Sequence, residues 1–273
     1  MSMPNKDLTR KIQLRQFSIL CEIDRICKRN EINYYLIGGS ALGAVRHSGF
    51  IPWDDDIDIA LLRHDYDRLL ECCKKELSNT FFLQTSETDK HYFLGFSKVR
   101  INGTLFEESF YVDSKMHQGI FLDIFPLDNI TDNKIGAYLR FYLVKLLTKI
   151  ILLKYNRIDT VNSMLVQILF FPVVKFVPNR MLLNLVDKNV QLGKSTNSTN
   201  VINYFTVYKL KKELFPLSIW GTPRLANFEG REFPVPEHTD AYLTQLFGDY
   251  MKLPPEKDRI GHQIINVEFG DDK

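Results

Sequence analysis

The sequence predicts an α+β fold, with helices and strands mixed in the first part of the chain and a largely helical region after them. Up to residue 130, segments with helical spacing of apolar residues alternate with short apolar runs typical of strands. Residues 131–200 are unusually apolar, and residues 201–273 combine short patterns with several prolines and aromatic residues. We therefore divide the chain into a core (1–130), an apolar helical region (131–200) and a carboxy-terminal mixed lobe (201–273).

The individual elements follow from apolar spacing and from turn residues. We expect helices at residues 6–30, 40–46 and 64–77. We expect strands at residues 32–37, 80–85, 92–101, 104–110 and 119–125, and an acidic strand directly after Trp53. Beyond residue 130 the pattern stays mainly helical as far as Leu192, and a segment rich in Ser, Thr and Asn predicts a polar linker at residues 193–200.

The overall composition is that of an ordinary globular protein. Apolar residues make up 45% of the 273, and 35 Lys and Arg against 33 Asp and Glu give a net charge of +2. Because so small a charge creates no attracting field, we expect no nucleic-acid partner. The four cysteines form no Cys-x-x-Cys pair and are expected in helices near the core, which fits a reducing compartment. The amino terminus lacks an apolar signal core, so we expect a cytoplasmic protein.

A glycine–serine turn followed by four carboxylates is the most informative segment; it contains Gly38, Gly39, Ser40, Asp54, Asp55, Asp56 and Asp58. Side chains alternate along a strand, so we expect Asp56 and Asp58 on one face, about 6–7 Å apart. Such carboxylates repel each other, and a cation between them would keep both ionised. Oxygen ligands suit Mg²⁺ or Mn²⁺, and the amides of the turn suit phosphate oxygens. A solvated acidic turn is the alternative, but the apolar continuation of the strand favours a metal-dependent phosphoryl-transfer site.

A second acidic position interrupts the apolar strand expected at residues 119–125. This residue is Asp123, and a carboxylate in such a place is costly unless a cation or hydrogen bonds satisfy it. It could end the strand by bonding to the following turn. We interpret it instead as a third metal ligand.

Residues 35–60 closely resemble the LicD family of choline-phosphate transferases and their relatives, which decorate cell-surface glycans. The matching segment reads YLIGGSALGAVRHSGFIPWDDDIDIA. Two further stretches match, GIFLDIFPLD at residues 119–128 and FGDYM at residues 247–251, the latter followed by Pro254 and Pro255. The resemblance runs from the first helix to about His262 and is weakest in the apolar middle region.

The resemblance implies a nucleotidyltransferase-like core, in which a Gly-Ser turn and three carboxylates on adjacent strands of a mixed sheet hold metal and phosphates. Gly39 and Ser40 match the turn, Asp56 and Asp58 the paired ligands, and Asp123 the third carboxylate. It also implies a phosphotransferase that moves phosphocholine from CDP-choline to a hydroxyl of a teichoic acid, lipopolysaccharide or capsule precursor and releases CMP. Asp123 could also take the proton of the acceptor hydroxyl.

Three alternatives to this function stay open. The first keeps the chemistry but uses another CDP-activated phospho-alditol or phospho-amine donor. The second is a nucleotidyltransferase that acts on a small molecule and releases pyrophosphate. The third is a glycan-binding protein with a vestigial site, against which the intact set of carboxylates argues.

Four further side chains are candidates for contacts with the donor. Arg46, Lys98 and Arg100 could bind phosphate, and the last two are expected on one strand face. A solvated charge is the alternative for each of them. Trp53 could face a quaternary ammonium through cation–π attraction, and its alternative is a loop anchor packed on the core.

Residues 138–177 combine long apolar runs with several interspersed Lys and Arg residues. Buried or partner-facing helices would explain this pattern. An interfacial surface would explain it too, with basic residues at lipid headgroups and apolar residues inserted below them. This second interpretation predicts a peripheral contact at the inner face of the membrane, where a lipid-linked glycan acceptor would lie.

Overall fold

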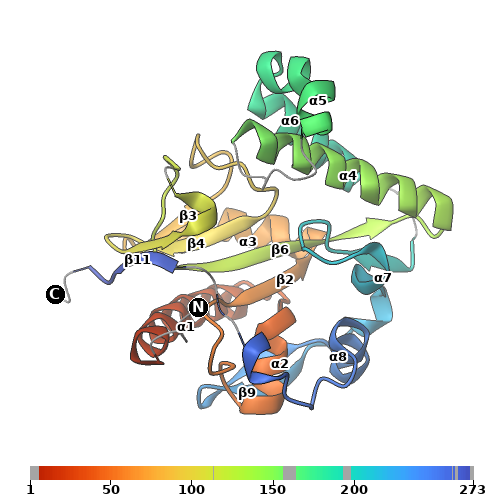
Figure 1. The fold of residues 1–273 in the computed structure, drawn as a ribbon. Coiled ribbons are helices and arrows are strands. Elements are labelled where there is room, and N and C mark those ends of the chain that lie inside the picture. Colours follow the sequence, from red (N-terminus) through yellow and green to blue (C-terminus); the bar gives the residue numbers. More distant parts are fainter. Residues whose placement is uncertain are drawn as a thin grey trace.

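The computed structural model describes residues 6–112, 114–155, 164–192, 198–259, 261 and 264–270. Most of the linker expected at residues 193–200, and His262 at the end of the matching region, lie outside them. Within the described residues, a seven-stranded mixed sheet forms the centre of the fold, with two small two-stranded sheets beside it (Figure 1). The expected α+β class is confirmed.

The central sheet is arranged around its longest strand, β6. On one edge β6 pairs in parallel with β2, and on the other it pairs antiparallel with β4. Its last residues, from Asp128 to Ile130, pair antiparallel with β7. The strands of this sheet are β1 (Tyr35–Leu36), β2 (Asp58–Leu62), β3 (Phe81–Gln84), β4 (Ser97–Ile101), β6 (Phe121–Ile130), β7 (Asn200–Ile202) and β8 (Leu214–Pro216). The small sheets join β5 (Leu105–Glu108) to β11 (Ile264–Glu268) and β9 (Arg224–Phe228) to β10 (Arg231–Val235).

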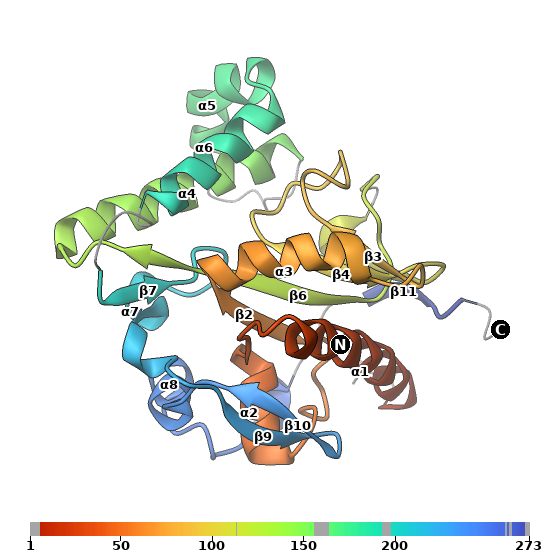
Figure 2. The ribbon, with the colours of Figure 1, turned by 180° about the vertical axis from the view of Figure 1, so that it is seen from behind.

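Helices surround this sheet in three groups. The first group consists of α1 and α3, which pack across one face of the sheet. This is the near face in Figure 2. The short helix α2 contacts β2, β9 and α8 below the sheet, while α4, α5 and α6 form a layer above it (Figures 1 and 2). The helices are α1 (Lys6–Arg29), α2 (Gly38–His47), α3 (Arg63–Glu76), α4 (Lys134–Lys154), α5 (Met164–Phe176), α6 (Asn179–Gln191), α7 (Leu210–Glu213) and α8 (Thr239–Phe247), with 3-10 turns at η1 (Ser109–Tyr111), η3 (Leu217–Ile219) and η4 (Glu256–Asp258).

Pro126 lies in the middle of β6, where the sequence pattern alone would end the strand. The N–H of Asp123 donates to the Ile57 carbonyl on the β2 side, so the N–H groups of even-numbered residues point to the other edge. On that edge β4 pairs only as far as Ile124, and the pairing of β6 with β7 begins only at Asp128. The N–H that proline lacks therefore falls outside both of these ladders, and no ladder hydrogen bond is lost.

The three helices expected in the first region are confirmed, with ends shifted by one or two residues. The prediction of the acidic strand is wrong in one respect, because β2 begins at Asp58 and Asp56 lies in the segment before it. The strand expected at residues 92–101 forms only from Ser97. Tyr92 and Phe93 instead pack in a loop, within the apolar cluster beneath α4 and α6.

The positions of the cysteines also agree with expectation. Cys21 and Cys27 lie in α1, Cys72 and Cys73 lie in α3, and all four are free thiols. Among the described helices, none combines the length and the apolar character needed to span a bilayer.

A buried ion pair fixes α3 to β6 near the carboxy-terminal end of that strand. Arg63 donates to both carboxylate oxygens of Asp128, from Nε to Oδ1 at 2.7 Å and from Nη2 to Oδ2 at 2.8 Å. The Asp128 side chain is 1% exposed and that of Arg63 is 11% exposed. Removing one partner of such a pair leaves the other charge buried without compensation.

We expect Asp128→Asn to lower the free energy of unfolding by about 3–5 kcal/mol, because the Arg63 guanidinium would stay buried. The control is Glu22→Gln, which breaks the more exposed pair with Arg25 and should cost less than about 1 kcal/mol. Urea unfolding of both variants measures the difference. Equal losses in the two variants would contradict the prediction.

Candidate active site

Three functional side chains lie side by side across the central sheet. Asp58 of β2 is opposite Asp123 of β6, and Asp123 is opposite Lys98 of β4. Residues paired in this way share one face of a sheet. The next positions in β2 and β6, Ile59 and Ile124, face the other way and are fully buried in the main core. Because side chains alternate along each strand, Asp58, Asp123 and Lys98 point away from the face of the sheet that α1 and α3 cover.

Asp123 is neutralised by an internal cation. Its Oδ1 lies 2.6 Å from Nζ of Lys98, an ion pair whose side chains are 11% and 3% exposed. The same ammonium lies 3.6 Å from the centre of the Phe121 ring. No described group forms a hydrogen bond with Asp123 Oδ1, so this buried oxygen depends on the charge of Lys98 alone.

The glycine–serine turn lies directly against the carboxylates. Ser40 Oγ accepts a hydrogen bond from the Asp58 N–H at 2.9 Å. A Cβ atom at Gly39 would come within 2.5 Å of Asp54 Oδ2, so a side chain there would displace this carboxylate. Gly38 has φ +53° and begins α2, and its N–H donates to Tyr242 Oη at 2.9 Å. The expected proximity of turn and carboxylates is thus present in the structure.

Asp58 has a pKa well above its ordinary value. Burial is the main cause, and the charges of Asp56, Asp123 and Asp54 raise it further, while Lys98 opposes the shift. Several negative charges therefore lie close to Asp58, even though Asp56, contrary to expectation, is not in the same strand. Gathered carboxylates of this kind are typical of functional sites.

The segment that carries the other aspartates is held by α1. Gln13 Nε2 donates to the Asp54 carbonyl at 2.8 Å, and Gln16 Nε2 donates to the Asp55 carbonyl at 2.6 Å. Asp55 itself is 2% exposed and packs against Gly261, where a Cβ atom would lie 2.8 Å from Asp55 Oδ2. The acidic run thus contains at least one carboxylate with a packing role.

The remaining basic candidates are bonded to the protein itself. Lys98 and Arg100 do share one face of β4, as expected. Arg100 is 1% exposed and donates to Gln84 Oε1 and to the Gly119 carbonyl. Arg46 lies in the last turn of α2, away from Gly39, and donates to the Tyr250 carbonyl at 2.6 Å. Phosphate contacts of Arg46 and Arg100 stay predictions, and their visible bonds hold the fold together.

Trp53 already has a cation over its ring. The Arg259 guanidinium lies 5.1 Å from the ring centre, and His47 approaches edge-on with ring centres 6.2 Å apart. Trp53 is partly exposed and packs against the core, which agrees with the alternative of a loop anchor. Its contact with a substrate ammonium stays a prediction.

Comparison with known proteins matches residues 31–139 to the LicD/FKTN/FKRP nucleotidyltransferase domain. Lipopolysaccharide cholinephosphotransferase LicD of Haemophilus influenzae is 30% identical over 269 residues, covering 95% of this chain and 97% of that protein. The chain belongs to the LicD family. It is therefore an enzyme, a transferase of the LicD type.

Two other relatives match shorter parts of the LicD-type chain. The human ribitol 5-phosphate transferase FKRP is 50% identical over 34 residues, which are 12% of this chain and 7% of that protein. An uncharacterized protein of Rickettsia prowazekii is 25% identical over 126 residues, 39% of this chain and 46% of that protein. These matches agree with the family but are too short to transfer an activity.

The charges of the site carboxylates act on two tyrosines that sequence reasoning did not select. Tyr92 is 2% exposed, its hydroxyl has no hydrogen-bond partner among the described residues, and the Asp123 charge contributes to its raised pKa after burial. The pKa of Tyr208 is raised by burial first, then by Glu213 and by the charge of Asp58. Tyr92 comes from a loop after β3 and Tyr208 from the carboxy-terminal part. No spacing in the sequence connects either tyrosine with the acidic motif.

The carboxylates offer suitable donors for a divalent metal. All are oxygen ligands, and Lys98 already supplies Asp123 with a positive charge of the kind an ion would bring. Within the described parts of the chain, however, no three Asp, Glu, His or Cys side chains converge closely enough to hold a metal ion. The chemistry of the donor set fits Mg²⁺ or Mn²⁺, and binding would require the carboxylates to draw together.

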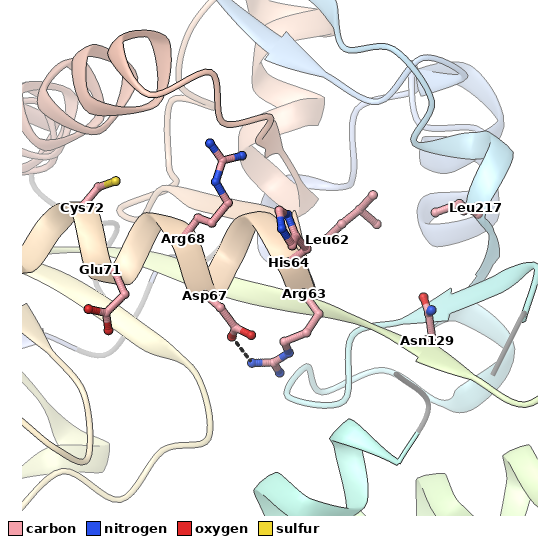
Figure 3. A pocket seen from close by; sticks show the side chains of 9 residues that line it. All are labelled: Leu62, Arg63, His64, Asp67, Arg68, Glu71, Cys72, Asn129 and Leu217. Carbon is pink, nitrogen blue, oxygen red and sulfur yellow. Dashed lines mark hydrogen bonds and ion pairs between the residues drawn. The ribbon is translucent and has the colours of Figure 1, made fainter. Parts of the chain in front are cut away.

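A separate hollow of about 790 Å³ lies along α3 (Figure 3). Its lining residues are Leu62, Arg63, His64, Asp67, Arg68, Glu71, Cys72, Asn129 and Leu217. Arg63 is bonded to Asp128 and Asp67, and Arg68 donates to the Asn30 carbonyl at 2.7 Å. The hollow contains none of the carboxylates of the candidate site, and its arginines already have partners.

Glu213 is a buried carboxyl at the end of α7. Burial raises its pKa from 4.5 to about 7, while a hydrogen bond from Thr206 and the charge of Lys145 act in the opposite direction. Burial also lowers the pKa of Lys145. The folded protein therefore favours a neutral Glu213 at mildly acid pH.

We expect the wild type to lose stability as pH rises through about 7, because Glu213 must then ionise while buried. A pKa raised from 4.5 to about 7 corresponds to a contribution of about 3 kcal/mol to the free energy of unfolding. This contribution is fully present below pH 4.5 and is lost above the raised pKa. Glu213→Gln should remove this part of the pH dependence. Urea unfolding at pH 5 and pH 8 measures it, and equal pH dependence in both proteins would argue against the assignment.

Proposed function

We propose that this enzyme transfers phosphocholine from CDP-choline to a hydroxyl group of lipopolysaccharide or of another cell-surface glycan, with release of CMP. The observation that carries the proposal is the similarity to Haemophilus influenzae LicD over nearly the full length of both chains. The row of Asp58, Asp123 and Lys98 supports it, because phosphoryl transfer depends on charge neutralisation and positioning. Free thiols and a nucleotide-linked donor fit a cytoplasmic reaction.

In this reaction, residues of the chain would accept the proton of the acceptor hydroxyl and hold the phosphates of the donor in position. The acceptor oxygen bonds to the choline-bearing phosphorus, and the bond from that phosphorus to the oxygen of CMP breaks. Asp123, whose partner Lys98 lies 2.6 Å away, accepts the proton of the acceptor hydroxyl. The first turn of α2, at Gly39 and Ser40, offers backbone amides to the phosphate oxygens.

Asp56, Asp58 and Asp123 would hold Mg²⁺ or Mn²⁺ for this reaction. The ion would supply positive charge to the diphosphate and to the departing CMP. The raised pKa of Asp58 supports this part of the proposal, since gathered carboxylates are stabilised by a bound cation. Lys98 lies beside the same carboxylates and is the best placed of the basic candidates to contact a phosphate.

We expect Mg²⁺ to raise the unfolding temperature of the wild type, because an ion bound only by the folded state stabilises it. The gain is about 2.7 kcal/mol when the ion is at 100 times its Kd. Asp58→Asn should lose this gain, while Asp67→Asn, at an exposed position of α3, should keep it. A thermal-shift titration measures the effect, and a wild type that does not respond to either Mg²⁺ or Mn²⁺ would refute the metal site.

The test of activity is product analysis after incubation with CDP-choline, Mg²⁺ and a lipopolysaccharide acceptor. We expect CMP release together with phosphocholine on the glycan, and a loss of at least about 100-fold in Asp58→Asn. Asp67→Asn again serves as the matched control. Teichoic acid and capsule precursors as acceptors would show which glycan is used.

A CDP-activated phospho-alditol is the alternative donor, and the match to the ribitol 5-phosphate transferase is too short to decide between the two. CDP-ribitol is therefore assayed in parallel with CDP-choline and with another CDP-activated amine. Faster turnover of CDP-ribitol than of CDP-choline would indicate that the enzyme transfers ribitol phosphate by the same reaction. Release of pyrophosphate in place of CMP would instead indicate a small-molecule nucleotidyltransferase.

A further inference from the structure

The outward side of α4 is apolar over more than half of its length. Its exposed large apolar side chains are Ile135, Tyr138, Leu139, Tyr142, Leu143 and Leu146. These positions follow steps of three and one, so they form one stripe along a helix. Ala137, Phe141 and Val144 occupy the opposite side and are buried in the cluster shared with α6. Packing in the core accounts for the apolar residues on the inner side of α4, but not for those of the exposed stripe.

The two neighbouring helices add to the exposed apolar surface. On α5, Ile168, Phe171 and Phe176 are exposed, and Met181 and Leu185 are exposed on α6. Both helices pack against α4, and the three lie together in the layer above the sheet, away from α1 and α2 (Figures 1 and 2). Apolar side chains gathered in one part of a surface mark a site of interaction.

This layer is also strongly basic. The basic residues in the described parts of residues 134–192 are Lys134, Arg140, Lys145, Lys149, Lys154, Lys175, Arg180 and Lys188. The only acidic residue in the same described parts is Asp187, so their net charge is +7, against +2 for the whole chain. Lys134, Lys175, Arg180 and Lys188 are exposed. Such a charge attracts an anionic surface.

The chemistry of the exposed side chains favours a lipid surface over a protein partner. Nζ of Lys175 lies 5.5 Å from the ring centres of both Phe171 and Phe176, so apolar rings and a cation are displayed together. Tyr138 and Tyr142, with ring centres 4.4 Å apart, have apolar bodies and polar tips suited to the depth of lipid headgroups. A second copy of the chain would bring two basic layers together, which is unfavourable.

We infer that the outward faces of α4, α5 and α6 bind the surface of a bilayer that contains anionic lipids. The apolar stripe of α4 enters the boundary between headgroups and acyl chains, and the lysines and arginine around it contact lipid phosphates. This inference concerns a different surface from the carboxylate site. It does not rest on the proposed function, and its test needs neither donor nor acceptor.

The test is co-sedimentation of the full chain with vesicles at low salt. One set contains phosphatidylcholine alone, and the other contains about 30% phosphatidylglycerol. We expect at least about tenfold stronger partitioning to the anionic vesicles, weakened by added salt. No preference for the anionic vesicles would overturn the inference.

Two variants and a control locate the contact. Leu139→Glu/Leu143→Glu should lower the partition coefficient at least about tenfold, because it places two carboxylates in the apolar stripe. Lys175→Gln/Lys188→Gln should reduce the preference for anionic lipid. Leu225→Glu changes an equally apolar exposed residue of β9 and should leave binding unchanged.

Unfolding curves establish that each variant is folded, and light scattering gives its oligomeric state. Undiminished binding by folded Leu139→Glu/Leu143→Glu would overturn the assignment to α4. A stable dimer that this variant dissociates, without any vesicle binding by the wild type, would assign the surface to a second copy instead.

Discussion

The parallel pairing of β2 with β6 is the constraint on which the rest of the structure depends. The register that places Asp58 opposite Asp123 also places Ile59 opposite Ile124, and both isoleucines are fully buried. A shift by one residue would turn the isoleucines outward and bury the carboxylates under α1 and α3. The apolar core therefore fixes the register, and the register brings the two carboxylates together without any direct attraction between them.

The gathered carboxylates raise the energy of the folded protein, and several contacts offset this. Lys98 neutralises Asp123, Ser40 accepts the Asp58 N–H, and two glutamines of α1 hold the carbonyls of the preceding segment. An acidic surface turn without function would relax by turning its side chains to water. Here the fold holds several of them close to Asp58, which is the usual arrangement where charge serves a reaction.

Local signals in the sequence were sufficient for the long helices and for the acidic motif. The apolar spacing predicted α1 and α3 within one residue at each end, and Asp58 and Asp123 proved to be neighbours across two strands. Nonlocal contacts were not predictable. The continuation of β6 past Pro126 depends on the β4 ladder ending at Ile124 and the β7 ladder beginning at Asp128, and the place of Tyr92 depends on a loop from elsewhere in the chain. The burial of Arg100 and its bonds to Gln84 and Gly119 were not predictable either, and its phosphate contact stays a prediction.

The strand β6 joins the carboxylate site to the basic apolar layer. Asp123 lies near its start, Arg63 holds it at Asp128, and after Ile130 the chain reaches α4 at Lys134. From Asp123 to Ile130 the strand rises about 23 Å, and this span is stiffened by pairing with β2, β4 and β7. The pairing therefore holds the carboxylate site and the start of α4 in one rigid arrangement, so a bilayer bound by α4 would keep a constant position relative to Asp123.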